Sequence, residues 1–313
     1  MTSSPQYFLG FDGGATKTAG AIIDSNGNAI AERTSGGPSN FQIIGTEQAS
    51  RNIMDVANAM LDETGVDFLH VAGIFLGLTG AGRKADQDIM LVGFSQFLKS
   101  AGRNVPWIGV ESDALAALEG AFPGKAGMIL ISGTGSILLA KDDHGTVRRV
   151  GGWGRFVGDE GSGYFIGKAG LTACAKEYDG RGNATRISEL VRERMNIDSP
   201  QTLVRKIYQE NFDIASVARL VIDAATEGDE IARSIIDAAS DELILHVRSA
   251  IRQIGKEIPI AFMGSIITHH NPLVTRLTGL ILQEFPMVRI CPPEQSAAVG
   301  AALLALKGAT NPS

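Results

Sequence analysis

Apolar positions in the first part of the chain alternate between short runs and helix-spaced stripes. The short runs predict strands, and apolar residues three or four positions apart predict helices. Asn26-Gly27, between two of the runs, is a strong hairpin turn. In chain order we expect strands at 7–11, 19–24 and 28–34, a helix at 46–64, a strand at 71–78, a helix at 85–100, a strand at 106–110 and a helix from 113 onward.

The same order returns after Gly127. Strands are expected at 128–132, 136–141, 146–151, 259–263 and 288–291, with helices at 271–284 and 296–306. A block of helices at about 162–256 interrupts this order as an insertion. The two halves share little residue identity, so the repeat is one of topology. Three hairpin-linked strands followed by alternating helices and strands predict a mixed α/β sheet flanked by helices in each half.

Length and charge narrow the class of protein. A chain of 313 residues suggests about two domains, and two domains facing each other would leave a cleft for a small ligand. The net charge of −6 argues against nucleic acid or an acidic membrane as partner, because phosphate contacts need clustered Lys and Arg. The apolar runs are far shorter than the roughly 20 residues of a membrane span, and residues 1–6 lack a signal peptide's features. We therefore expect a cytoplasmic protein.

Glycine and cysteine usage adds two constraints. Many of the 38 glycines follow apolar runs, where glycine allows a tight turn or brings backbone close to a ligand. The two cysteines, Cys174 and Cys291, give no disulfide framework and no cysteine metal site. The glycine clusters suggest a glycine-lined cleft and lie at 10–14, 77–82, 133–135, 151–163 and 264.

A polar hairpin between the first two strands carries candidate phosphate chemistry. Gly13 and Gly14 allow a tight turn whose amides face a phosphate. Asp12, at the strand end, is placed to hold Mg²⁺ through water. The alternative is a polar turn with a solvated aspartate. The candidate nucleotide-binding residues of this hairpin are Asp12, Gly13, Gly14, Thr16, Lys17 and Thr18, the threonines as hydroxyl donors.

A second Gly/Thr hairpin occupies the equivalent position of the second half. It spans Ser132–Ser136 and contributes Gly133, Thr134 and Gly135 as candidates. Two such hairpins in equivalent positions favour phosphate binding over two unrelated turns. Neither is a Walker loop, because no Gly-x-x-x-x-Gly-Lys-Ser/Thr leads into a helix, and neither is a Rossmann fingerprint, because the glycines lie in a β-hairpin.

These motifs resemble those of the sugar kinase, heat-shock protein 70 and actin superfamily. Over nearly its whole length the chain resembles N-acetylglucosamine kinases and the related benzoyl-CoA reductase activator ATPases. The resemblance implies two ribonuclease-H-like domains, each a mixed sheet flanked by helices, with a nucleotide in the cleft between them. It divides the chain into residues 1–117, residues 118–295 with the helical insertion, and a hinge helix in 296–313.

The resemblance also assigns nucleotide contacts. It makes the two hairpins the phosphate-binding hairpins, with Gly264 and Ser265 as an adenosine contact. The family usually has a third glycine where this chain has Ala15. That difference matters only if the position needs a positive φ.

Asp113 is the candidate catalytic base. It follows the strand at 106–110 and starts a helix, so a plain helix cap explains it equally well from local sequence. In the sugar kinases that the chain resembles, an aspartate here accepts the proton of the sugar hydroxyl, a step that adds about 10²–10⁴-fold to a rate. Glu111 is a nearby rival that matches no family role. Thr79 and Gly80 follow a strand and are expected to line the acceptor side.

Two glycine-rich stretches point to a sugar. Gly151–Gly154 encloses Trp153, an apolar platform for the C–H face of a sugar, and Gly158–Gly163 offers the carboxylates of Asp159 and Glu160 to its hydroxyls. The alternative is a glycine loop with a helix cap at Asp159 or Ser162. By resemblance, Trp153, Gly154 and Asp159 contact the sugar, and Asn40 matches a substrate-binding asparagine. The candidate substrate residues are Asn40, Thr79, Gly80, Asp113, Gly152, Trp153, Gly154, Asp159 and Glu160.

The sequence therefore predicts an ATP- and Mg²⁺-dependent kinase of an amino sugar, with N-acetylglucosamine and its 6-hydroxyl as first choice. Glucosamine, N-acetylmuramic acid and glucose stay open as acceptors. An ATPase switch that activates a partner protein also stays open, although the chain lacks paired cysteines for an iron–sulfur cluster. A catalytically inactive sugar sensor is a third reading. A homodimer is an expectation of the resemblance alone.

Overall fold

The computed structural model describes residues 5–34 and 36–310. The protein is mixed α/β, with two mixed sheets flanked by helices. By internal contacts it divides into two compact units, Met1–Lys125 with Pro293–Ser313, and Ala126–Pro292. A boundary after residue 117, as expected from the sequence, would cut helix α4 (Asp113–Ala121). The unit boundary instead follows residue 125.

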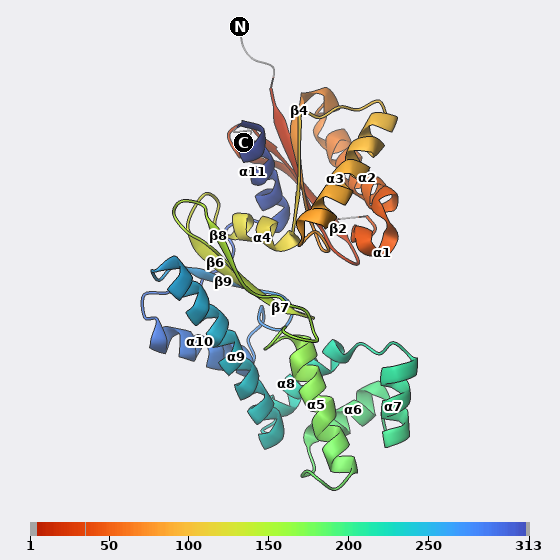
Figure 1. Ribbon diagram of the computed structural model, residues 1–313, viewed down its shortest axis with the longest axis vertical. Coiled ribbons are helices and arrows are strands. Elements are labelled where there is room, and N and C mark those ends of the chain that lie inside the picture. The colour runs from red at the N-terminus through yellow and green to blue at the C-terminus, as the bar shows by residue number, and fades with distance from the viewer. Residues whose placement is uncertain (1–4, 35, 311–313) are drawn as a thin grey trace. The chain divides into compact units, whose positions relative to one another are not determined.

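The sheet of the first unit has the strand order β3-β2-β1-β4-β5. The three N-terminal strands are antiparallel, and β4 and β5 run parallel to β1 (Figure 1). Because β4 runs parallel to β1, the chain leaves the sheet at the same edge after both strands. The strands are β1 (Tyr7–Gly13), β2 (Thr18–Asp24), β3 (Ala29–Thr34), β4 (Val71–Leu78) and β5 (Trp107–Glu111).

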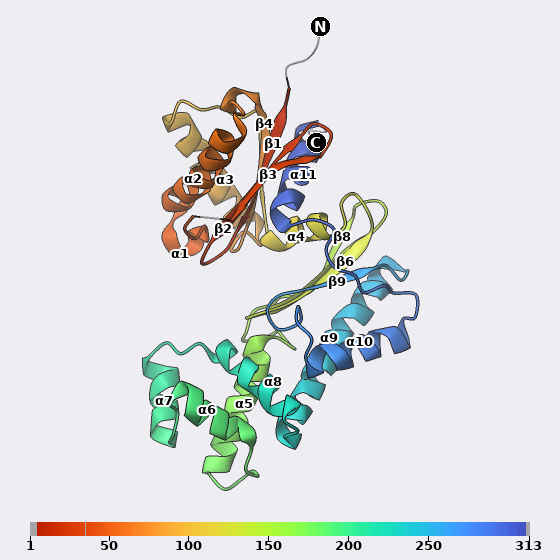
Figure 2. The same cartoon turned by 180° about the vertical axis from the view of Figure 1, so that it is seen from behind.

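Helices cover both faces of this sheet. Helices α2 (Thr46–Thr64) and α3 (Lys84–Ser100) lie on one face, and α4 and α11 (Ala297–Thr310) lie on the other (Figures 1 and 2). Side chains of β1 alternate between the two cores, with Leu9 and Phe11 in one and Phe8 in the other. The short helix α1 (Phe41–Ile44) and a 3₁₀ turn (Phe68–His70) complete the unit.

Small residues let α11 lie directly on β1. A Cβ at Gly10 would come 2.0 Å from the backbone nitrogen of Ala302, so no larger residue fits there. Buried alanines such as Ala298 and Ala301 form the same face of the helix. These small residues allow the close approach of α11 and β1 within the first unit.

The sheet of the second unit has the order β8-β7-β6-β9. Its first three strands are antiparallel, and β9 runs parallel to β6. The strand expected at 288–291 is reduced to one parallel bridge between Ile260 and Ile290. The strands are β6 (Gly127–Ser132), β7 (Ser136–Lys141), β8 (Val147–Gly151) and β9 (Ile260–Met263).

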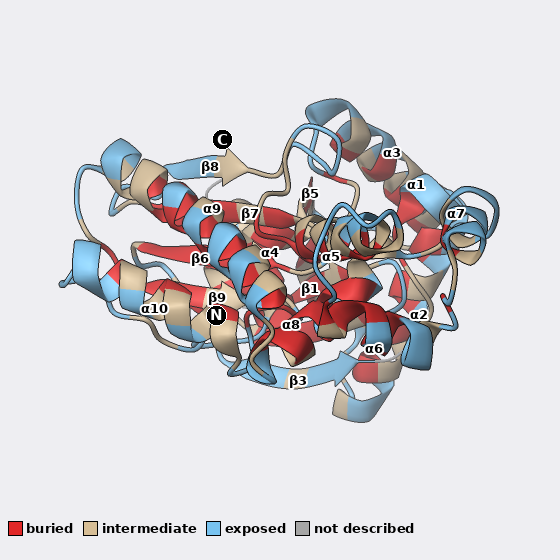
Figure 3. Cartoon of the chain, turned by 90° about the horizontal axis from the view of Figure 1, so that it is seen from below, coloured by how far each residue is buried: buried red, intermediate tan, exposed pale blue. Residues whose placement is uncertain are grey.

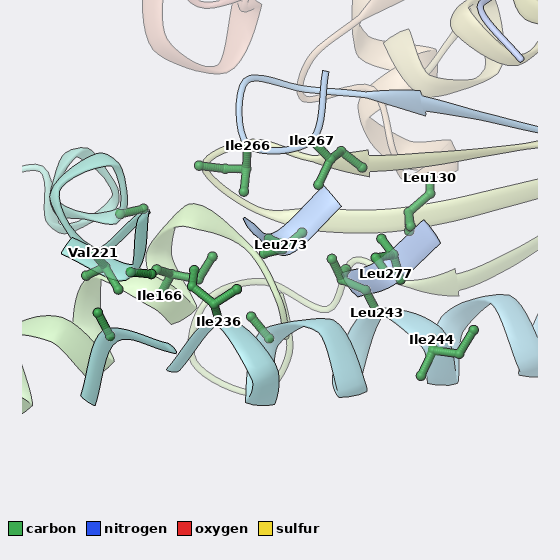
Figure 4. Close-up of a cluster of buried hydrophobic side chains, with 14 of the residues drawn as sticks. Leu130, Ile166, Val221, Ile236, Leu243, Ile244, Ile266, Ile267, Leu273 and Leu277 are labelled. Atoms are coloured by element: carbon green, nitrogen blue, oxygen red, sulfur yellow. The ribbon is translucent and has the colours of Figure 1, made fainter. Parts of the chain in front are cut away.

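The helical insertion forms the large core of the second unit. Figure 3 shows buried residues on one side of these helices and exposed residues on the other. Figure 4 shows Ile236 and Leu243 of α9 beside Leu273 and Leu277 of α10, with Leu130 of β6 close by. The helices are α5 (Gly163–Tyr178), α6 (Arg186–Met195), α7 (Pro200–Gln209), α8 (Ala218–Thr226), α9 (Glu230–Ile254) and α10 (Pro272–Glu284), with a 3₁₀ turn at Ile214–Val217.

Within the described ranges, none of the helices combines the length and the apolar character that crossing a membrane requires.

Candidate functional site

The first hairpin joins β1 to β2 by a tight turn. Gly13 pairs with Thr18, and the Gly14 amide donates to the carbonyl oxygen of Lys17 at 3.0 Å. A Cβ at Gly13 would lie 2.1 Å from Ser39 Oγ, so this position requires glycine. Ala15 does not have a positive φ, so alanine in place of a third glycine causes no backbone strain there. The tip of the hairpin, from Ala15 to Lys17, is exposed.

Thr18 has a different task from the one predicted. Its side chain is fully buried, and Oγ1 lies 2.8 Å from both the Gly37 carbonyl oxygen and Ser39 Oγ. A hydroxyl held in this way cannot reach a phosphate at the exposed tip. Thr18 instead ties the hairpin to the loop that leads to Asn40, a contact between residues too far apart in sequence for the motif to reveal.

The hairpin faces a pocket within the first unit. This pocket has a volume of about 370 Å³ and is lined by Asp12, Gly14, Thr16 and Lys17 together with residues at the start of α11. Ser296 donates to Glu32 there at 2.6 Å, and its Oγ accepts from the Val299 amide. Four of the six candidates of the first hairpin thus line one pocket, whereas Gly13 and Thr18 do not.

Asp12 and Asp113 are close enough to influence each other's charge. Burial raises the pKa of Asp12 to about 6, and the negative charge of Asp113 adds to the rise, while Lys17 opposes it. A half-buried carboxylate beside a second one is a favourable position for a divalent cation, which would neutralise both. In the described ranges no three His, Cys, Asp or Glu side chains gather as a metal site. A cation here would take most of its ligands from water and phosphate, as Mg²⁺ does.

Asp113 is the first residue of α4 and is not its N-cap. Ser112 is the N-cap of α4, and its Oγ accepts from the Leu115 amide. One carboxylate oxygen of Asp113 accepts from the Ala114 amide at 2.8 Å, and the other accepts from the Thr79 hydroxyl at 2.5 Å. Asp113 is therefore not the N-cap of α4, although one of its carboxylate oxygens binds an amide of the first turn.

Thr79 links Asp113 to the first hairpin. Its amide donates to the Gly13 carbonyl oxygen at 2.8 Å, while its hydroxyl donates to Asp113. The loop after β4 thus fixes the carboxylate relative to the first hairpin within one unit. From the sequence we expected Thr79 to line the acceptor side and assigned it no specific role. In the structure its hydroxyl binds the Asp113 carboxylate.

Asn40 and Gly80 are neighbours beside this loop. The Asn40 amide donates to the Gly14 carbonyl oxygen at 3.2 Å, and Asn40 Oδ1 accepts from the Gln42 amide to cap α1. Gly80 has a φ of +96°, and a Cβ there would lie 3.1 Å from Asn40 Oδ1. Gln42, which the sequence reading missed, donates from Nε2 to the Gly80 carbonyl oxygen. Only its place two residues after Asn40 hinted at a role.

Glu111, the rival base, is engaged elsewhere. Gln87 Nε2 donates to Glu111 Oε2 at 2.9 Å and to the Ala81 carbonyl oxygen at 3.0 Å. Burial raises the pKa of Glu111. Its side chain braces the loop after β4 through Gln87.

The second hairpin is supported by the start of α5. Gly163 and Tyr164 donate their amides to the carbonyl oxygens of Gly133 and Thr134 at 2.7 and 3.2 Å. Gly264 lies against the same hairpin, because a Cβ there would come 2.4 Å from the Ser132 carbonyl oxygen. The side chains of Thr134 and Ser265 are exposed. The structure thus brings together the candidates Gly133, Thr134, Gly135, Gly264 and Ser265.

Asp159 lies at this hairpin. A Cβ at Gly135 would come 2.8 Å from Asp159 Oδ2, and Asp159 has a φ of +59°. Ser162, and not Asp159, caps α5, since its Oγ accepts from the Phe165 amide. Glu160 contributes its carbonyl oxygen, which accepts from Ser136 Oγ at 2.7 Å. Positive φ is rare outside glycine, so the fold holds Asp159 in place at some cost.

Trp153 stands out from the surface on a glycine turn. Its side chain is 73% exposed, and Gly151, Gly152 and Gly154 all have positive φ. The Arg149 guanidinium lies 5.5 Å from the centre of the indole ring. This cation–π contact covers one face of the ring. A Cβ at Gly151 would come 2.3 Å from His246 Nε2, a neighbour to which nothing in the sequence pointed. The exposed ring fits the predicted platform.

Comparison with known proteins places the chain in a family. The model of the BadF/BadG/BcrA/BcrD ATPase family matches residues 9–305. The chain belongs to this ATPase family. This confirms the resemblance stated from the sequence.

Two curated relatives of this family member match over almost their whole length. The N-acetylmuramic acid/N-acetylglucosamine kinase of Clostridium acetobutylicum is 30% identical, over 96% of this chain and 98% of that protein. The N-acetyl-D-glucosamine kinase of Dictyostelium discoideum is also 30% identical, over 97% of this chain and 98% of that protein.

A solved structure confirms the predicted fold class. A protein from Chromobacterium violaceum, proposed to be an N-acetylglucosamine kinase, matches with a TM-score of 0.76 and 26% identity. The match covers 96% of this chain and 99% of that one.

Proposed function

We propose that this member of the BadF/BadG/BcrA/BcrD ATPase family transfers the γ-phosphoryl group of ATP to a hydroxyl of an amino sugar. N-acetylglucosamine is the first candidate, because both curated relatives carry that activity in their names at 30% identity. The observation that carries the proposal is the Asp113 carboxylate, held by Thr79 beside Asp12 and the first hairpin. A sugar kinase needs such a base near a phosphate site.

The chemistry follows from these positions. Asp113 accepts the proton of the sugar hydroxyl, whose oxygen forms a bond to the γ-phosphorus while the bond to the bridging oxygen breaks and ADP leaves. Asp12 would hold Mg²⁺ through water, and the ion would supply charge neutralisation at the phosphates. The exposed tips of both hairpins and the Gly264–Ser265 turn would bind the nucleotide. Trp153, Asp159 and Asn40 would bind the sugar.

The proposal also covers the reaction partner, the oligomeric state and the cellular location of the protein. A small-molecule sugar is the partner in the reaction, and a homodimer stays a prediction that light scattering after size-exclusion chromatography tests. Dependence on ATP fits the cytoplasm, where the nucleotide is abundant.

The test is ADP release with Mg-ATP across a panel of sugars. The panel holds N-acetylglucosamine, N-acetylmuramic acid, glucosamine, N-acetylmannosamine and glucose. Asp113→Asn runs alongside, with Glu111→Gln as a matched control two residues away. We expect strong stimulation by an N-acetylated amino sugar, lost in Asp113→Asn and kept in Glu111→Gln. Turnover that is low and equal with every sugar would instead favour an ATPase switch.

A further inference from the structure

Helices α5 and α9 border a second pocket, which the proposed reaction does not use. Its volume is about 690 Å³, within the roughly 300–1,000 Å³ range of small-molecule sites. All of its lining residues belong to the second unit. Its apolar wall is formed by Phe165, Ala169, Ala173, Ile231 and Ile235.

This pocket uses the face of α5 that the core leaves uncovered. Ile166, Leu171 and Cys174 of α5 are buried in the core of the unit. Phe165 and Ala169 are only partly buried on the other face, so apolar surface stays in contact with water there. An apolar body bound in the pocket would cover that surface and gain about 25 cal/mol for each Å² buried.

Positive charge borders the apolar wall. Lys168 and Lys176 line the pocket from successive turns of α5 and are exposed. In the described part of the chain neither lysine has an ion-pair partner. Arg181 lines the same end as Lys176 and pairs with Asp179, and Glu230 is the one acidic side chain in the lining. The pocket therefore carries an excess of positive charge, although the whole chain has a net charge of −6.

We propose that this pocket binds an anionic amphiphile, a small molecule with a carboxylate or phosphate head and an apolar body. The ammonium groups of Lys168 and Lys176 bind the head, and the wall around Ala169 receives the body. Charge and shape together select this class, because a neutral apolar ligand would leave the lysines unused. The site lies on the flank of the helix whose first amides hold the second hairpin.

The experiment measures binding of four ten-carbon probes by isothermal titration calorimetry, below their micelle concentrations. Decanoate and decyl phosphate carry the two kinds of head, and decanol and decyltrimethylammonium are the neutral and cationic controls. We expect one or both anions to bind at least about tenfold more tightly than either control. Whichever anion binds more tightly identifies the head.

Three variants locate the binding. Lys176→Glu reverses a charge at the pocket, and Ala169→Trp fills it. Both are expected to weaken anion binding by about tenfold or more. Lys99→Glu, at an exposed lysine of α3 in the other unit, is the matched control and should stay within about twofold. Thermal unfolding confirms that each variant is folded, and Lys176→Glu decides the matter if Ala169→Trp does not fold.

Several results would overturn the proposal. Equal binding of decanol or decyltrimethylammonium would show that no anionic head is recognised. Unchanged anion binding in Lys176→Glu would place the probe elsewhere. Conversion of a dimer to monomers by Lys176→Glu would show that a second copy of the chain covers this pocket.

Discussion

Replacement of Asp12 by asparagine is expected to stabilise the free protein while it abolishes the reaction. The pKa of Asp12 is raised from 3.8 to about 6 by burial, and the charge of Asp113 adds to the rise. Each pKa unit corresponds to about 1.4 kcal/mol, so the charged carboxylate costs the folded state about 3 kcal/mol at neutral pH. Asparagine has nearly the same shape and carries no such cost.

Because folding raises the pKa of Asp12, the stability gained by Asp12→Asn depends on pH. Between about pH 4 and pH 6 the folded state keeps a proton on Asp12 that the unfolded state has lost, so native stability falls as the pH rises. The stability gained by Asp12→Asn should therefore be near zero below about pH 4 and complete above about pH 7. Titrating groups that do not interact with Asp12 cancel in the difference between the two proteins.

The assay is urea unfolding without nucleotide and with a chelator, in a Trp153→Phe background. Of the two tryptophans, only Trp107 then remains, and it stacks on Phe75 in the unit that holds Asp12. Asp62→Asn, at an exposed position on α2, is the matched control and should change little. An Asp12→Asn protein no more stable than its parent at pH 7.5, or a gain that does not change with pH, would refute the reasoning.

Three further predictions follow from the site. Asp113→Asn should lower kcat by about 10²–10⁴-fold and leave the Kd for ATP unchanged by calorimetry; a normal kcat would remove Asp113 as the base. Thr79→Val should lower kcat, because the Asp113 carboxylate loses the hydroxyl that positions it, and Thr79→Ser should restore it. A kcat in Thr79→Val equal to that of the parent would mean that the hydroxyl has no positioning role. Gly264→Ala should lower the Tm, because the position has a φ of +90° and an added Cβ would lie 2.4 Å from the Ser132 carbonyl oxygen; an unchanged Tm would contradict the close approach.

The sequence predicted the elements well because each depends on local pattern. The strand–hairpin–strand order of both units follows from apolar runs interrupted by glycine, and the structure reproduces it in both sheets. The strand at 288–291 failed, since its apolar run pairs with β9 at Ile290 alone. A short run predicts burial, whereas pairing along its whole length depends on what lies beside it.

Side-chain tasks at the site were less predictable because they depend on contacts between distant segments. Thr18 looks like an exposed hydroxyl donor in its motif, yet the loop at Gly37 and Ser39 covers it. Asp159 stays a predicted sugar contact, but its local sequence did not reveal that its carboxylate lies against Gly135 of the second hairpin. Neither contact has a signature in the few residues around it.

The two hairpins meet the same electrostatic requirement in the same way. In the first, the carbonyl oxygens of Gly13 and Gly14 accept amides from residues 79, 39 and 40. In the second, those of Gly133 and Thr134 accept amides from residues 163 and 164. The negative ends of the turn dipoles are thus bound inside each unit.

This arrangement leaves amide groups for a ligand. Among the described residues, the amides of Thr16, Lys17 and Thr134 have no backbone acceptor at the hairpin tips. Backbone amides that have no acceptor inside the protein attract an anion, whatever the side chains around them are. The glycine motif allows each turn, and the loops that bond its carbonyl oxygens leave these amides unpaired.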